Sequence, residues 1–362
     1  MRKALALAAK GRGYVNPNPM VGAVIVKNDR IIAQGYHEKY GEFHAERNAI
    51  NNCKEPPKDA AIYVTLEPCC HTGKTPPCTD AIIESGIKDV FIGTVDPNEK
   101  VAGKGIEILR KAGLSVETGI LESECKSLNS VFFHYIKTGL PYVTMKYAMT
   151  MDGKIATTTG ASKWITGEAA REHVHAQRSY NKGIMVGLGT VIGDDPMLTS
   201  RTDKGSELNP TRIICDTNLD IPMTSKVVET AGDYPTVIAT ASEDSDKIKE
   251  LSNAGCRIIT VEKKGRHIDF FKLMKDLGEE NIDSIYLEGG AKLNWEMLKA
   301  GLVNKINAYI ALKIFGGSTA PSPVGGEGVS FPDESIRLIN RNIVDLDGDI
   351  LIESEVVVCS QE

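Results

Sequence analysis

Two short motifs in the first eighty residues carry side chains that suit a metal-dependent hydrolysis. The first is a His-Ala-Glu motif at residues 44–46, and the second is a Pro-Cys pair at 68–69 followed by another cysteine, Cys78. His44, Cys69 and Cys78 are ligands of the kind that zinc prefers, and three of them leave one tetrahedral position open for water. Glu46 can take the proton of that water and pass it to a departing amine. The pattern predicts a zinc-dependent deaminase with one zinc ion per chain.

A purely structural zinc site is the alternative interpretation of the same residues. Such a site needs four protein ligands, and the nearest further candidates are Cys70 and His71. Because adjacent residues rarely both face one ion, Cys70 is expected to stay out of the ligand set, and His71 is the candidate fourth ligand. The catalytic interpretation is favoured, since a His-x-Glu motif at the start of a predicted helix is followed, one strand later, by the two cysteines.

Composition excludes several classes of protein. The 362 residues are 41% hydrophobic and 25% charged, which is typical of a globular protein long enough for two domains. No apolar run is long enough to span a membrane, and residues 1–10 favour an amphipathic helix over a signal peptide. We therefore expect a cytoplasmic protein without a membrane partner. The net charge of -6 and the lack of a basic stripe argue against a nucleic-acid partner, whereas a small anionic substrate is compatible with them.

Hydrophobic patterning predicts two α/β domains, 1–140 and 141–362, joined near a Gly-Leu-Pro segment at 139–141. In the first domain we expect strands at 21–26, 30–35, 61–66 and 90–94 and helices at 44–52, 78–85, 104–112 and 121–138. In the second we expect strands near 142–148, 184–186, 211–215, 236–239, 257–261 and 284–287, then terminal strands at 305–313 and 343–358 with an antiparallel edge. Helices should lie between them.

Two glycine-rich junctions in the second half each follow a predicted strand. They are the segments 186–190, Val-Gly-Leu-Gly-Thr, and 287–290, Leu-Glu-Gly-Gly. Neither matches the dinucleotide fingerprint G-x-G-x-x-G, because the third glycine of the first segment comes one residue late. The glycines either cradle a phosphate at a helix start or only tighten strand-to-helix turns. The residues alone favour the second interpretation, in which the glycines only tighten the turns.

The cysteine-bracketed segment 65–78, Thr-Leu-Glu-Pro-Cys-Cys-His-Thr-Gly-Lys-Thr-Pro-Pro-Cys, resembles the cytidine-deaminase superfamily. Within it, the segment is similar to the bifunctional riboflavin-biosynthesis deaminase–reductases. Deaminases of nucleosides or tRNA typically place two residues between their cysteines, whereas eight separate Cys69 from Cys78. Segments 18–22 and 39–46 match the same branch, and Cys70 departs from it, because the family often carries serine there. The resemblance implies a three-layer α/β/α first domain in which Asn18 binds the pyrimidine. It also implies that His37, His71 and Lys74 belong to the substrate pocket.

The second half resembles the reductase domain of the same enzymes, which is similar in fold to dihydrofolate reductase. The matching segments are 146–156, 162–166, 186–199 and 287–290. The resemblance implies that NADPH contacts Ala148, Trp164, Thr190, Asp194 and Thr217, and a helix start formed by Gly290, Ala291, Lys292, Leu293, Asn294, Trp295 and Glu296. It implies substrate contacts from Ser162, Arg178, Leu198, Arg201 and Glu288, with the two arginines suited to clamp a sugar phosphate. It also suggests a homo-oligomer.

The leading hypothesis is therefore a bifunctional enzyme of riboflavin biosynthesis. It would deaminate the phosphorylated pyrimidine 2,5-diamino-6-(5-phosphoribosylamino)pyrimidin-4-one, and then reduce the ribosyl side chain of the product to ribityl with NADPH. One alternative is a tRNA or nucleoside deaminase with an unrelated second domain. Another is a metal-stabilised module that senses a pterin- or flavin-like ligand. Whether Lys146, Asp152 or Glu288 moves a proton in the reduction is left open.

Overall fold

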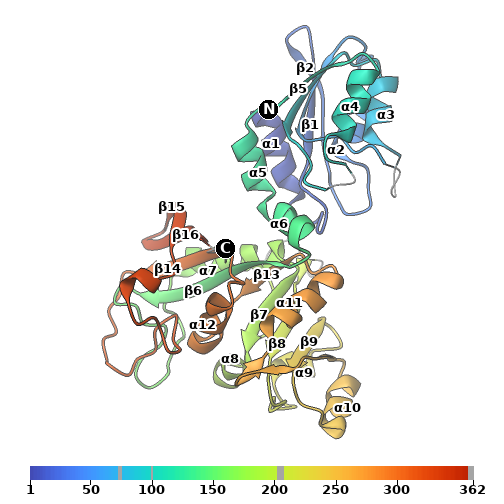
Figure 1. Cartoon of the computed structure of the whole chain (residues 1–362). Helices are drawn as coiled ribbons and strands as arrows, with labels where there is room; N and C mark the ends of the chain where they lie inside the picture. The colour runs from blue at the N-terminus through green and yellow to red at the C-terminus, as the bar shows by residue number, and fades with distance from the viewer. Residues whose placement is uncertain (72–75, 99–100, 202–207, 358–362) are drawn as a thin grey trace. The chain divides into compact units, whose positions relative to one another are not determined.

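The structure is a computed structural model that describes residues 1–71, 76–98, 101–201 and 208–357. Its internal contacts divide the chain into two units, Met1–Gly139 and Leu140–Glu362 (Figure 1). Each unit is built on its own β-sheet with helices on both faces. None of the described helices is both long enough and apolar enough to cross a bilayer.

The first unit contains a five-stranded mixed sheet in the order β2-β1-β3-β4-β5. Strand β1 runs antiparallel to both of its neighbours, whereas β3, β4 and β5 are parallel. The strands are β1 (Gly22–Lys27), β2 (Arg30–Tyr36), β3 (Ala61–Leu66), β4 (Asp89–Thr94) and β5 (Ser115–Thr118). The parallel half brings the carboxyl ends of β3 and β4 to one edge, where loops and helix starts can gather side chains.

Helices cover both faces of this sheet, so the predicted three-layer α/β/α arrangement is confirmed (Figure 1). Side chains alternate along β1, so that Val24 packs with Ala4 of helix α1, while Ala23 and Ile25 share a core with Ala49 of α2. Helices α1 and α5 lie together on the first face, and α2, α3 and α4 cover the second. The bounds are α1 (Arg2–Ala8), α2 (Ala45–Asn51), α3 (Cys78–Glu84), α4 (Lys104–Lys111) and α5 (Glu122–Leu128), with a 3₁₀ turn, η1 (Ala9–Gly11), after α1.

The expected single helix over 121–138 is wrong. It is two helices, α5 and α6 (Ser130–Thr138), which meet at Asn129. The Asn129 side chain accepts a hydrogen bond from the backbone N–H of Met20 at 2.8 Å and donates one to the Met20 carbonyl at 2.9 Å. This pairing with a residue 109 positions away holds Asn129 outside helical geometry, and a local pattern cannot reveal it. The short, mostly exposed strand β5 was not expected either.

The second unit has a nine-stranded sheet in the order β10-β9-β8-β7-β13-β6-β14-β16-β15. The strands from β10 to β14 are all parallel, and β16 and β15 add an antiparallel edge, as expected. The expected strand at 343–358 is a hairpin, because Asp347 and Gly348 turn the chain with positive φ. The strands are β6 (Tyr142–Thr150), β7 (Gly183–Gly187), β8 (Thr211–Cys215), β9 (Thr236–Thr240), β10 (Arg257–Thr260), β13 (Ser284–Leu287), β14 (Lys305–Ala311), β15 (Leu338–Leu346) and β16 (Asp349–Val356).

The two faces of this sheet differ in chemistry. Met145 and Leu287 belong to the main apolar core, where α11 and α12 pack. Tyr286 points to the opposite face, beneath α7. The helices are α7 (Glu168–Tyr180), α8 (Leu188–Asp194), α9 (Lys226–Glu229), α10 (Ser245–Asn253), α11 (Phe270–Glu279) and α12 (Ala291–Lys299), with a two-stranded ribbon of β11 (Lys263–Lys264) and β12 (His267–Ile268) and a 3₁₀ turn, η3 (Pro332–Glu334).

We predict that a fragment ending at Gly139 folds without the rest of the chain, because it holds its own sheet and its own buried core. Thermal unfolding followed by circular dichroism should give one cooperative transition, and a fragment of residues 140–362 should do the same. Loss of cooperative unfolding in either fragment would show that the units depend on each other for stability.

Candidate active sites

The first candidate site lies where β3 ends and helices α2 and α3 begin. His44 is the residue that caps the N-terminus of α2, Cys69 lies three residues beyond β3, and Cys78 is the first residue of α3. Helix α2 approaches the sheet closely at Gly35, since a Cβ there would lie only 2.3 Å from the backbone nitrogen of Ala49. This close approach brings His44 to the end of β3.

The three side chains meet in a geometry that fits zinc. The Nδ1 atom of His44 lies 3.5 Å from the Sγ atom of Cys69 and 3.4 Å from that of Cys78, and the three atoms lie within 4.8 Å of one another. Tetrahedral zinc with ordinary Zn–N and Zn–S bonds separates its nitrogen and sulfur ligands by about 3.5 Å. The pKa of Cys69 is lowered to about 4 by hydrogen bonds from Cys78 and His44. A thiolate, which a metal requires, is therefore already favoured at Cys69.

Glu46 lies in the first turn of α2 and is only 3% exposed. Burial raises the pKa of this carboxyl to about 7, although the nearby His44 lowers it in part. A carboxyl group with a pKa near neutrality can both accept and release a proton at physiological pH. Its place beside three ligand atoms is the one expected of a proton shuttle rather than of a ligand.

Two of the residues expected to bind substrate lie beside the ligand cluster. The Nδ2 atom of Asn18 is 3.4 Å from the Nε2 atom of His37, and the other ring nitrogen of His37 is 3.1 Å from the Phe43 carbonyl oxygen. The His37 ring stands edge-on to that of His44, with centroids 5.3 Å apart. The structure thus brings Asn18 and His37 to the rim of the metal site.

The remaining expected substrate residues belong to the loop between the cysteines. His71 is exposed and close enough to Asp96 to lower its pKa in part, although burial raises the pKa of that carboxyl to about 6 overall. Lys74 lies outside the described residues, so its role stays a prediction.

Sequence reasoning assigned no role to Glu67, which positions this site from behind. Its carboxylate is 3% exposed and accepts hydrogen bonds from the backbone N–H groups of Asp96, Gly103 and Ile106 at 3.2, 3.0 and 3.3 Å. These donors belong to the segment after β4 and to the first turn of α4. Glu67 therefore fixes that segment against the strand end that leads to Cys69. Its partners are 29 to 39 residues away, so a local motif gives no sign of them.

The second candidate site is a cavity of about 990 Å³ within the second unit. It opens at the carboxyl ends of β6, β7, β8 and β13, where the order of parallel strands reverses, the usual place for a ligand in such a sheet. Most of the expected cofactor and substrate residues line it, namely Ala148, Ser162, Arg178, Thr190, Asp194, Leu198, Thr217, Glu288, Gly290, Ala291, Lys292, Leu293, Asn294 and Glu296. Ser162 donates a hydrogen bond of 2.9 Å to Asp194, which joins the two expected sets.

Three expected residues do not line this cavity. Trp295 is buried against Gly326 on the other side of α12, so the structure does not support a direct cofactor contact for it. Arg201 is exposed. Trp164 is 69% exposed and has a left-handed backbone (φ 64°), and its ring stacks on the Arg171 guanidinium at 4.4 Å.

The residues of this cavity fit a nucleotide cofactor. Gly289 and Gly290 precede α12, and a Cβ at Gly289 would lie 2.7 Å from the Oδ1 atom of Asn294. That Oδ1 atom is buried and has no hydrogen-bond partner among the described residues. A helix N-terminus with unsubstituted glycines lets backbone N–H groups approach a phosphate closely, and the free Oδ1 acceptor suits a hydroxyl group of the same ligand. The phosphate-cradle reading of the glycine junction is therefore favoured over a simple tight turn.

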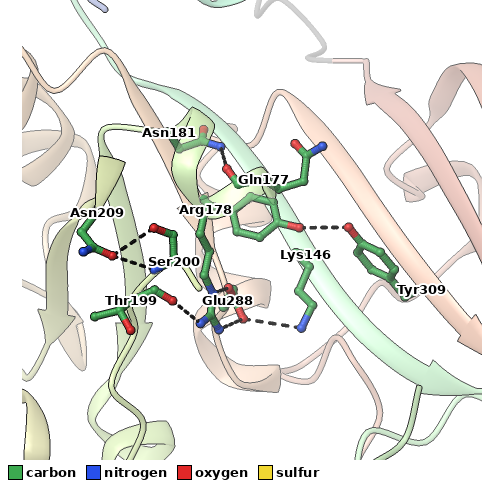
Figure 2. A network of polar contacts seen from close by, with 10 residues as sticks. Lys146, Gln177, Arg178, Asn181, Thr199, Ser200, Asn209, Glu288 and Tyr309 are labelled. Carbon is green, nitrogen blue, oxygen red and sulfur yellow. Dashed lines mark hydrogen bonds and ion pairs between the residues drawn. The ribbon is translucent and has the colours of Figure 1, made fainter. Parts of the chain in front are cut away.

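Glu288 is the centre of charge in the cavity (Figure 2). Arg178 binds its two oxygens at 2.6 and 3.0 Å and also donates to the Thr199 carbonyl at 3.0 Å, while the Nζ atom of Lys146 lies 3.5 Å from the same carboxylate. Burial alone would raise the pKa of Glu288, but the two cations lower it to about 2. The carboxylate is thus charged throughout the physiological range.

This arrangement gives Arg178 a task beyond the expected phosphate clamp. Its guanidinium holds Glu288, and it lies with Arg201 close enough to His175 that both, after burial, help to lower the pKa of that histidine to about 4. Both arginines therefore act on His175, and a joint contact of the two with phosphate stays a prediction.

Comparison with known proteins agrees with both sites. Residues 1–94 match the family model described as cytidine and deoxycytidylate deaminase zinc-binding region, and residues 141–352 match the RibD C-terminal domain. The riboflavin biosynthesis protein RibD of Actinobacillus pleuropneumoniae is 51% identical over 99% of this chain and 94% of its own length. The chain belongs to the RibD family of riboflavin-biosynthesis proteins.

Solved RibD structures agree with this fold over 98% of the chain. Acinetobacter baumannii RibD, form 1, is 34% identical with a TM-score of 0.87, and covers 98% of this chain and 97% of its own. The deaminase/reductase from Thermotoga maritima is 38% identical with a TM-score of 0.85 and the same coverage. The predicted cytidine-deaminase-like first half and reductase-type second half are confirmed.

We predict that Glu288 makes the stability of this RibD-family chain depend on acid. Its pKa of about 2 lies below the unfolded value of about 4.3, so its contribution is complete above that value and is lost as the pH falls toward 2. The full shift corresponds to roughly 3 kcal/mol. Urea unfolding at pH 5 and pH 3 should show that the free energy of unfolding falls less on acidification in Glu288→Gln than in the wild type. The exposed Glu250→Gln is the control, and an equal fall in all three proteins would contradict the prediction.

Proposed function

We propose that the chain is a bifunctional enzyme that first deaminates 2,5-diamino-6-(5-phosphoribosylamino)pyrimidin-4-one and then reduces the ribosyl side chain of the product with NADPH. The observation that carries this proposal is the pairing of a His-Cys-Cys metal site beside Glu46 with a separate glycine-lined cavity in the second unit. Family membership over nearly the full chain supports both activities together. The RibD relatives also disfavour the nucleoside-deaminase and ligand-sensor alternatives.

Each activity is proposed to belong to one domain, with deamination in 1–140 and reduction in 141–362. The division of contacts after Gly139 supports this assignment. We also propose a cytoplasmic location, because thiolate ligands and NADPH both suit a reducing compartment. A homo-oligomer is proposed as well, supported by Ile339 and Ile343, which are exposed on the edge strand β15.

In the proposed deamination, the chain's own residues bind, orient and exchange protons. His44, Cys69 and Cys78 would hold zinc, which when bound acidifies water for attack on a ring carbon. Glu46 takes the proton of that water and returns it to the nitrogen that leaves as ammonia. Asn18 and His37, at the rim of the site, orient the pyrimidine, and His71 and Lys74 are proposed to approach its phosphate.

In the proposed reduction, residues of the second unit position two molecules against each other. The cofactor NADPH supplies a hydride when bound. The contacts proposed for it come from the residues that line the cavity around α8 and α12 and from Trp164, with Trp295 left out because it faces away. Arg178, Lys146 and Glu288 present a fixed arrangement of charges to the substrate, while Ser162 and Leu198 shape the wall and Arg201 is proposed to reach the phosphate.

We predict that Glu46→Gln keeps its zinc and loses deamination. Glutamine occupies the same space but cannot take up a proton, and a positioned acid–base group contributes about 10²–10⁴-fold in rate. Ammonia release from the diaminopyrimidine phosphate should therefore fall by at least about 10²-fold, while elemental analysis shows unchanged zinc. Cys78→Ser is the contrasting variant, since it should lose zinc. Unchanged turnover in Glu46→Gln would overturn the zinc-hydrolase proposal.

We predict that NADPH is consumed only when the deaminated sugar phosphate is present. The cavity carries cations around Glu288 that suit a phosphorylated pyrimidine, so dihydrofolate should leave NADPH absorbance constant. The diaminopyrimidine phosphate should do the same in the Glu46→Gln variant, which cannot convert it to the deaminated product. Stopped assays with purified product measure this directly. Equal oxidation with dihydrofolate would indicate a folate reductase instead.

A further inference from the structure

A row of buried polar side chains lies on the sheet face beneath α7, next to the cavity but outside its wall. Tyr286, Asn307 and Tyr309 are all 0% exposed. They come from β13 and β14, on either side of β6, and the two tyrosines share a core with the apolar Ala170 and Leu351. Burying two hydroxyls and an amide among apolar groups is costly unless these groups are paired. Their presence therefore needs an explanation beyond packing.

Part of this row is already a hydrogen-bonded chain. The Nδ1 atom of His173, on α7, is 2.8 Å from the Tyr309 hydroxyl, which is 3.3 Å from the Tyr286 hydroxyl. Beyond His173, the Nε2 atom of Gln177 lies 3.4 Å from the other ring nitrogen. Figure 2 shows Tyr309 and Lys146 on neighbouring strands, with the Tyr309 hydroxyl pointing back toward the strand of Lys146. This series of hydrogen-bonded side chains thus runs from half-buried residues of α7 inward to β13.

The inner end of the chain lies directly behind the charged cluster of the cavity. Tyr286 precedes Glu288 by two residues, so both side chains lie on the same face of the sheet. Asn307 on β14 is in register with Lys146 on β6, which places it in the same layer as the Lys146–Glu288 pair. The row and the cavity therefore share one layer of the sheet.

Asn307 lies at a gap between the hydrogen-bonded side chains of this row and the Lys146–Glu288 pair. Neither its Nδ2 nor its Oδ1 atom makes a hydrogen bond of ordinary distance and angle to a described residue. The amide nevertheless lies close to both tyrosine hydroxyls, because burial raises their pKa values and hydrogen bonding to Asn307 lowers them in part. A buried amide without a well-formed direct hydrogen bond, among other polar groups, is a typical holder of an internal water.

We propose that Asn307 holds a water molecule that links the Tyr286–Tyr309–His173 chain to Lys146 and Glu288, and that this link supplies the proton consumed in the reduction. The inference rests on the proposed reductase function. In that reaction the hydride of NADPH bonds to C1′ as the C1′–O4′ bond breaks, O4′ takes one proton, and NADPH leaves as NADP⁺. The proton comes from solvent. Because substrate and cofactor would cover the open side of the cavity, the proton would reach Lys146 and Glu288 along the sheet face beneath α7. Asn307 is a positioning residue on this route.

The test compares Asn307→Leu and Tyr309→Phe with the wild type, using Tyr234→Phe as a matched control outside the row. Both row variants should lower kcat of the reduction by about tenfold or more and increase the solvent deuterium isotope effect on kcat. KM for the substrate and NADPH, and the dissociation constant of NADPH, should change less than about twofold. The control should match the wild type in all of these quantities.

The melting temperature distinguishes an Asn307 amide that binds a water molecule from one that has no partner. Leucine is close to asparagine in size, so replacing an amide without any partner should raise the melting temperature, whereas replacing one that holds water should lower it. A raised melting temperature, or a wild-type kcat in either row variant, would overturn the proposal. If the wild type itself does not oxidise NADPH with the deaminated substrate, the proposed reductase function fails instead.

Discussion

Each unit places a glutamate directly after a central parallel strand, where its carboxylate is buried and must find donors. A buried carboxylate without partners would cost several kcal/mol, so the surrounding segments are fixed by the need to satisfy it. Glu67, after β3, is bound by three backbone N–H groups, which draw the segment beyond β4 and the start of α4 toward the metal site. Glu288, after β13, is bound by Arg178 and Lys146. One position in the sheet thus supports two different sites.

Glu67 and Glu288 are satisfied by different kinds of donor, because the two sites must offer different groups to their ligands. Backbone donors satisfy Glu67 from behind and leave the ligand atoms of His44, Cys69 and Cys78 free to meet at the helix starts. Side-chain cations satisfy Glu288 from within the cavity, so they remain available to a substrate. The first arrangement builds a rigid support for a metal, and the second builds a charged surface. The same parallel-strand edge provides the place for both.

The sequence predicted best what depends on residue type and short spacing. His44, Glu46, Cys69 and Cys78 follow from their chemistry, and the bounds of β3, β8 and β13 match the expected strands. The break at Asn129 was missed because its partner is Met20. The Arg178–Glu288 pair, 110 residues apart, and the packing of Trp295 against Gly326, away from the cavity, were missed for the same reason. Such features arise only when distant segments pack, and no local pattern carries them.

The pKa values of two buried carboxyl groups, one in each site, are shifted in opposite directions. This difference constrains where the proton for the reduction can come from. Burial raises the pKa of Glu46 to about 7, whereas Arg178 and Lys146 overcome burial and hold the pKa of Glu288 near 2. At neutral pH Glu288 is therefore an ionised carboxylate, with no proton of its own to give. Reduction nevertheless consumes one proton in each turnover. On the proposed route the proton reaches the cavity through neighbouring groups. Lys146 lies 3.5 Å from Glu288, and the hydroxyls of Tyr286 and Tyr309 lie on the same face of the sheet.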